Sequence, residues 1–175
     1  MNDHPALAQQ GTQAHKKFFL QQQQLRKRRT TSAKDEAHLT VISFALFGEV
    51  YGLELETLQE VLKVGSITRV PQSPEYLRGI INLRGNLITV IDLKKRFGAP
   101  IAEVTRDSRI MIVRHEQRSV GLLVDQVLEI LQLEKQSIVP PPAHLPESKR
   151  QLIKGLGEKQ DKVIILLALK HLFNH

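Results

Sequence analysis

The sequence lacks cysteine and tryptophan, and it has only two tyrosines among its 175 residues. Without cysteine the chain can form neither disulfides nor thiolate metal sites, which is typical of proteins from reducing compartments. No apolar run approaches the roughly 20 residues that a membrane-spanning helix requires, and the N-terminus has no apolar signal segment. We therefore expect a cytoplasmic protein with an aliphatic core.

The chain is basic, with a formal net charge of +7, but this charge is unevenly distributed. Residues 1–38 hold seven basic and three acidic residues in a glutamine-rich stretch, and the rest of the chain carries a net charge of only +3. This composition is typical of a solvated, flexible arm. An alternative is a short amphipathic helix that touches an acidic partner or a membrane surface. The folded domain is expected to span residues 39–175.

After residue 38 the pattern changes to short apolar runs that are separated by turn residues, which predicts a mostly β fold. The runs "LTVISFALF" and "VYGLEL" predict a hairpin, whereas "ETLQEVLKVGSITRVP" is ambiguous between a helical turn and strands. A single helical turn and a short helix are also predicted. The first lies in "SPEYLRG", with Ser73 as its N-cap and Gly79 at its end, and the second runs from the cap Asp92 to Gly98.

The second half of the chain repeats this order of elements. At a sequence offset of 69, Gly52 matches Gly121 and Glu60 matches Glu129, and at an offset of 76, Gly79 matches Gly155. The chain is thus predicted to be an internal duplication, with copies at about 39–98 and 108–173. Units this small bury a limited fraction of their surface, so we expect the copies to pack together, with a binding groove between them.

One turn distinguishes the two copies. The segment "NLRG", residues 82–85, matches "EKQD", residues 158–161, which is an ordinary polar turn. Since the fold does not require leucine and arginine there, Leu83 and Arg84 are candidates for an exposed recognition site. The alternative is that Arg84 only solubilises the tip while Gly85 permits a positive φ. The residues alone favour neither interpretation.

The segment "EVYGLELETLQEVLKVGSITRVPQSPEYLRGIINLRGNLITVIDLKKRFG" and the later "VGLLVDQVLEILQLEKQSIVPPP" resemble the two halves of the CheW family of bacterial chemotaxis adaptors. The resemblance covers about residues 39–174. It implies two intertwined, five-stranded SH3-like barrels with short helices and a C-terminal helix, without catalytic activity or cofactors. The implied partners are the regulatory domain of the histidine kinase CheA and the cytoplasmic tip of methyl-accepting chemotaxis receptors, so that membrane contact is only indirect.

The resemblance also assigns partner-binding positions. Those tied to coupling in the family match Leu58, Glu60, Gly79 and Arg84, and the "NLRG" motif adds Asn82, Leu83 and Gly85. Thr89 departs from the family, which commonly has proline there. Because threonine can donate a ladder hydrogen bond that proline cannot, we expect the strand edge at Thr89 to differ.

Other classes of function find little support in the sequence. His171 and His175 stand at helical spacing but have no further metal ligands nearby, and no nucleophile with a plausible base can be identified. Neither a catalytic nor a metal site is predicted. The alternative function is nucleic-acid binding by an SH3-like barrel with a basic arm, but few aromatic residues are interleaved with basic ones after residue 38.

Overall fold

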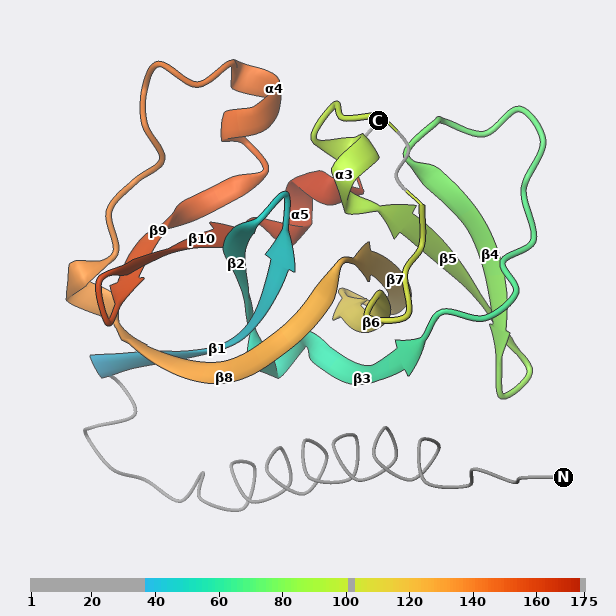
Figure 1. The fold of residues 1–175 in the computed structure, drawn as a ribbon, viewed down its shortest axis with the longest axis horizontal. Coiled ribbons are helices and arrows are strands. Elements are labelled where there is room, and N and C mark those ends of the chain that lie inside the picture. The colour runs from blue at the N-terminus through green and yellow to red at the C-terminus, as the bar shows by residue number, and fades with distance from the viewer. Residues whose placement is uncertain (1–36, 101–102, 174–175) are drawn as a thin grey trace, which may run out of the picture. The chain divides into compact units, whose positions relative to one another are not determined.

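The computed structural model describes residues 37–100 and 103–173 (Figure 1), so the predicted arm and its alternative as an amphipathic helix fall almost wholly outside the described residues. Described elements of the first copy are β1 (His38–Leu46), β2 (Glu49–Glu54), η1 (Leu55–Thr57), β3 (Leu58–Lys63), β4 (Leu77–Leu83), β5 (Asn86–Asp92) and α3 (Leu93–Arg96). Those of the second copy are β6 (Arg109–His115), β7 (Arg118–Val124), β8 (Gln126–Glu134), η2 (Lys135–Ser137), α4 (Glu147–Arg150), β9 (Ile153–Lys159), β10 (Lys162–Leu167) and α5 (Leu169–Leu172).

The strands form two five-stranded sheets that each combine both copies. Barrel A has the order β8-β1-β2-β10-β9, and barrel B has the order β3-β6-β7-β5-β4. Barrel A lies to the left and barrel B to the right in Figure 1. Two parallel pairings, β10 with β2 and β5 with β7, join strands of different copies. The prediction of two intertwined five-stranded barrels with short helices and a C-terminal helix is confirmed.

The register repeats between the barrels with the offsets that the sequence indicates. In the β3–β6 pair Leu58 lies opposite Val113, and in the β1–β8 pair Phe44 lies opposite Val127. Val127 follows Leu58 by 69 residues, and Val113 follows Phe44 by the same number. The β4–β5 turn has a positive φ at Arg84 (51°), and the β9–β10 turn has one at Gln160 (50°), which matches Arg84 at the offset of 76. The duplication therefore extends from the sequence pattern to the backbone conformation of individual turns.

Apolar and aromatic side chains fill the region where the two barrels meet. The ring of Tyr51 on β2 lies 5.9 Å from that of Phe44 on β1 and 5.6 Å from that of Phe97, which follows α3. All three residues are buried. Packed rings of this kind join the two barrels in the interior, and the binding groove expected between the copies stays a prediction.

The predicted helical turn in "SPEYLRG" is a single turn, in which Leu77 donates its N–H to the carbonyl of Pro74. Its predicted ends are wrong: Ser73 donates its hydroxyl to the carbonyl of Val70 and caps no turn, and β4 begins at Leu77, before Gly79. The predicted short helix is confirmed as α3: the Asp92 carboxylate accepts from the N–H of Lys95, and Gly98 has a φ of 84°.

Thr89 does not lie at a strand edge. It pairs with Ile80 of β4 on one side and with Val120 of β7 on the other, because β5 is an interior strand. The predicted difference at a sheet edge is therefore wrong, since there is no edge at this position.

Gly79 closes barrel B. It lies inside β4 with a φ of 147°, beside an isolated bridge in which Thr68 and Ile80 exchange two backbone hydrogen bonds of 2.9 and 2.8 Å. A Cβ at position 79 would stand 2.2 Å from the carbonyl oxygen of Thr68. Gly155 has the same role in barrel A, where a Cβ would stand 2.9 Å from the carbonyl oxygen of Val139. The two glycines thus allow the segments that close each barrel to approach.

We predict that Gly79→Ala lowers the free energy of unfolding by about 3 kcal/mol or more, because backbone would have to move away from the new methyl group. Gly85→Ala is the matched control: Gly85 has a φ of 86°, but no atom lies within 4 Å of the place that an added methyl group would occupy. That variant should lose only about 1 kcal/mol from the left-handed conformation. Urea unfolding of both variants measures the difference, and equal losses would contradict the role given to Gly79.

Candidate functional site

A two-residue turn at the tip of the β4–β5 hairpin carries Arg84. Arg84 and Gly85 both have a positive φ, 51° and 86°, which is the arrangement of a type I′ turn and matches the twist of a hairpin. The Asn82 side-chain oxygen accepts a hydrogen bond of 2.9 Å from the N–H of Gly85. Asn82 and Gly85 therefore fix the turn, and Arg84 is its projecting side chain.

A β-bulge on β3 places the carboxylate that Arg84 meets. The register with β6 shifts between Leu58, opposite Val113, and Glu60, opposite Ile112, so that Gln59 is the extra residue. The Gln59 side-chain oxygen accepts from the hydroxyl of Ser119 on β7 at 2.6 Å. Bulges re-aim the side chains beside them. Here the shift sets Glu60 on the side of β3 that also carries Leu62, which packs against the barrel B core.

Arg84 and Glu60 form a bidentate ion pair. Nη1 donates to Oε1 at 2.7 Å and Nη2 donates to Oε2 at 3.0 Å. These hydrogen bonds, together with attraction to the carboxylate charge, raise the pKa of the Arg84 guanidinium above its ordinary value. The two side chains differ in exposure: Arg84 is 73% exposed, whereas Glu60 is only 21% exposed. Glu60 is thus the support, and Arg84 is the group presented to solvent.

The guanidinium keeps donors available for a second contact. A guanidinium has five N–H groups in one plane, and the ion pair uses two of them. The other three remain on a side chain whose orientation the Glu60 carboxylate already holds. Such a fork is preorganised for a carboxylate or a carbonyl of another molecule, since less conformational entropy is lost on binding.

Leu87 is an exposed apolar residue of the same hairpin, and it was not among the residues predicted from the sequence. Leu87 lies on β5, opposite Asn82, and is 70% exposed. Leu83, the leucine predicted to be exposed, is half-buried and packs against the barrel B core. The alternation of β5 could have identified Leu87, because Ile88 and Val90 point into the core and place Leu87 on the opposite face with Thr89.

The remaining predicted partner-binding residues are buried. Leu58 is fully buried and Gly79 is buried inside β4. Any influence of either residue on a partner would act through the position of β3 or β4. Of the seven predicted site residues, the structure therefore brings Glu60, Asn82, Arg84 and Gly85 together at one exposed place. We call these four residues with Leu87 the Arg84 site.

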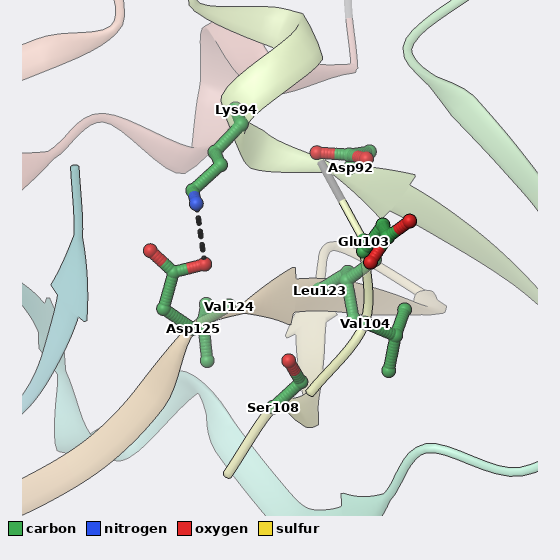
Figure 2. A pocket seen from close by; sticks show the side chains of 8 residues that line it. All are labelled: Asp92, Lys94, Glu103, Val104, Ser108, Leu123, Val124 and Asp125. Atoms are coloured by element: carbon green, nitrogen blue, oxygen red, sulfur yellow. Dashed lines mark ion pairs between the residues drawn. The ribbon is translucent and has the colours of Figure 1, made fainter. Parts of the chain in front are cut away.

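A small pocket elsewhere in the domain lies beside α3 (Figure 2). Lys94 of α3 reaches Asp125 at 2.8 Å, and Asp125 also accepts from the N–H of Phe47 at 3.3 Å. The acidic groups around the pocket do not form a metal site: among residues 37–100 and 103–173 no group of three or more His, Cys, Asp or Glu could hold an ion. The Lys94–Asp125 pair instead ties the β1–β2 turn to α3.

The described part of the chain contains no helix that is long and apolar enough to cross a membrane.

Comparison with known proteins identifies the domain. A family model described as the CheW-like domain matches residues 40–175. The chain is 30% identical to a chemotaxis protein CheW of Helicobacter pylori, over 79% of this chain and 83% of that protein. It is 31% identical to a probable chemotaxis protein CheW of Rhizobium etli, over 77% of this chain and 86% of the relative.

A solved structure agrees with this assignment. The crystal structure of the scaffolding protein TtCheW from Thermoanaerobacter tengcongensis matches with a TM-score of 0.73 and 42% identity, and the match covers 78% of this chain and 93% of that one. The family model, the relatives and the fold agree: the chain belongs to the CheW family of chemotaxis scaffold and adaptor proteins.

Proposed function

We propose that this protein couples methyl-accepting chemotaxis receptors to the histidine kinase CheA, and that it does so without catalysis. The Arg84 site carries this proposal. It combines an exposed guanidinium, held by Glu60 at 2.7 and 3.0 Å, with an exposed leucine of the same hairpin, and arginine is a common anchor of protein interfaces. The cytoplasmic tip of a receptor and the CheA regulatory domain are the partners that the family suggests.

The proposed mechanism is positional. Glu60 holds the Arg84 fork in one orientation, so that a partner meets a preformed contact and need not order a long side chain. Leu87 adds apolar area that is exposed in the free protein. Leu58 and Gly79 keep β3 and β4 in place. The protein would work in the cytoplasm and reach membrane-associated receptor arrays only through its partners. The family assignment favours this proposal over nucleic-acid binding.

We also propose that residues 39–175 are the adaptor domain and that residues 1–38 are a separate basic arm. Removing residues 1–36 should leave the melting temperature within a few degrees of the parent value, because the predicted strands and the duplication begin only after this segment. Differential scanning calorimetry of the shortened chain measures this. A clearly lower melting temperature would show that the arm is part of the folded unit.

We predict that Arg84→Ala weakens binding of the receptor tip or the CheA regulatory domain by roughly 30-fold or more, as loss of a central arginine anchor does. The urea midpoint should not change, because exposed ion pairs contribute little to folding stability. Gln160→Ala, at the matching turn of the other copy, is the control for both measurements. Isothermal titration and urea unfolding test the prediction. Parent-like binding by Arg84→Ala would contradict the proposed function.

Arg84→Lys tests whether the fork or only the charge is needed. Lysine keeps the positive charge but loses the planar pair of donors that meets both Glu60 oxygens. We expect its binding to be closer to that of Arg84→Ala than to that of the parent, in the same titration. Full binding by the lysine variant would mean that a simple charge is sufficient at this place.

A further inference from the structure

Barrel A contains the counterpart of Glu60 without the counterpart of Arg84. Glu60 and Glu129 hold the same register position, because the residue pairs that follow them match at the offset of 69. After Glu60, Val61 pairs with Met111 and Leu62 with Ile110. After Glu129, Ile130 pairs with Ile42 and Leu131 with Val41. Both glutamates lie at a register shift of their strand pair. The matching hairpin tip in barrel A carries Gln160, whose φ of 50° is close to the 51° of Arg84.

Glu129 has a fixed backbone and an exposed side chain. The buried hydroxyl of Ser43 donates to the carbonyl of Glu129 at 2.7 Å and accepts from its N–H at 3.1 Å, which holds the bulge of β8 in place. Glu129 itself is exposed, and no ion pair joins it to any residue between 37 and 100 or between 103 and 173. In barrel B the equivalent carboxylate of Glu60 is only 21% exposed and pairs with Arg84.

Two exposed apolar residues lie on the strands β8 and β10, which carry Glu129 and border the β9–β10 tip. Val163, the counterpart of Leu87 at the offset of 76, is 57% exposed beside the β9–β10 tip. Leu128, which precedes Glu129 in the bulge, is 41% exposed. A carboxylate on a fixed backbone, with exposed apolar residues on its own strand and on β10, suits a guanidinium that arrives together with an apolar side chain. We call Leu128, Glu129 and Val163 the Glu129 site; Gln160 marks the tip position that Arg84 holds in barrel B and is not itself part of the site.

We propose that the Glu129 site is a second protein-binding surface, at which a partner supplies the arginine that barrel B supplies from its own chain. The internal template is the Arg84–Glu60 pair, which shows that a glutamate at this position of the barrel accepts a guanidinium through both oxygens. The partner is a protein that presents an arginine next to an apolar residue. That the partner is a chemotaxis component rests on the proposed function.

The first experiment tests the site without any partner. Gln160→Arg places a guanidinium on a turn whose backbone matches that of Arg84, so it should pair with Glu129 within the chain. The Nη–H resonances that this substitution adds to a ¹⁵N-edited NMR spectrum should be shifted and slow to exchange, because the template pair is made through Nη1 and Nη2. Adding Glu129→Gln should return these resonances to the positions of a free arginine. A free resonance in Gln160→Arg alone would overturn the proposal, because the site would not hold an arginine.

The second experiment tests the partner. The full chain is titrated with the CheA regulatory domain and, separately, with a receptor-tip fragment. Glu129→Gln removes the acceptor and Gln160→Arg fills the site from within, so each should weaken one of these interactions by about ten-fold or more. Asp161→Asn is the matched control: it removes a negative charge from the same tip, and asparagine tolerates the φ of 61° at this position. That variant should bind like the parent.

The outcomes separate this inference from the proposed function. If Arg84→Ala loses a partner while Glu129→Gln and Gln160→Arg both bind like the parent, the Glu129 site is refuted and the proposed function stands. If the parent binds neither probe, the proposed function fails, and the NMR measurement still decides whether the site accepts an arginine. Weakening of either titration by both substitutions, with Asp161→Asn unaffected, supports the proposal and identifies which probe carries the arginine.

Discussion

The parallel pairings of β5 with β7 and of β10 with β2 are the constraint on which the rest of the structure depends. Each joins a strand of one copy to a strand of the other, so neither copy completes a barrel alone. The same pairing of strands between the copies determines where the residues of the Arg84 site lie. Glu60 belongs to the first copy, but its position is fixed by the pairing of β3 with β6 and by Ser119 of β7, which belong to the second. A change at the junction of the copies would therefore reach the exposed arginine.

The two barrels show how a duplicated backbone can carry different chemistry. Both retain the glycines at which the closing segments approach, Gly79 and Gly155, because a side chain there would collide with backbone. Both retain the left-handed residue of the hairpin tip and the glutamate at the bulge. The residue at the tip differs, and it decides whether the glutamate is satisfied within the chain. The geometry is common to both copies, whereas the side chain that completes each site is not.

The sequence predicted the features that depend on local chemistry and repetition. Turn residues, the Asp92 cap and the repeated glycines indicated the hairpins, α3 and the duplication, since each acts over a few residues or recurs at a constant offset. The turn in "SPEYLRG" was predicted, but its ends at Ser73 and Gly79 were wrong, because the pairing of β4 begins within that segment. Leu83 was predicted to be the exposed leucine of the hairpin, but the exposed one is Leu87. The prediction compared the two turns residue by residue and did not use the alternation of side chains along β5, which exposes Leu87.

The Arg84–Glu60 pair could not be predicted, although both residues were identified as candidates. They lie 24 residues apart, on β3 and on the β4–β5 turn, and these elements stand at opposite ends of the strand order of their sheet. Only the curling of that sheet brings them together. The bulge at Gln59, which sets the face on which Glu60 lies, is a property of pairing with β6 and has no local signal in "LQEVLK".

The claim that Glu60 serves to hold Arg84 for a partner is tested most directly by a double-mutant cycle on partner binding. Arg84→Ala, Glu60→Gln and the combined variant are titrated with whichever of the receptor tip and the CheA regulatory domain the parent binds. Glu60→Gln should weaken binding when Arg84 is present and add little in the Arg84→Ala background, because its effect passes through the arginine. Additive losses from the two substitutions would contradict the account and show that Glu60 meets the partner independently of Arg84.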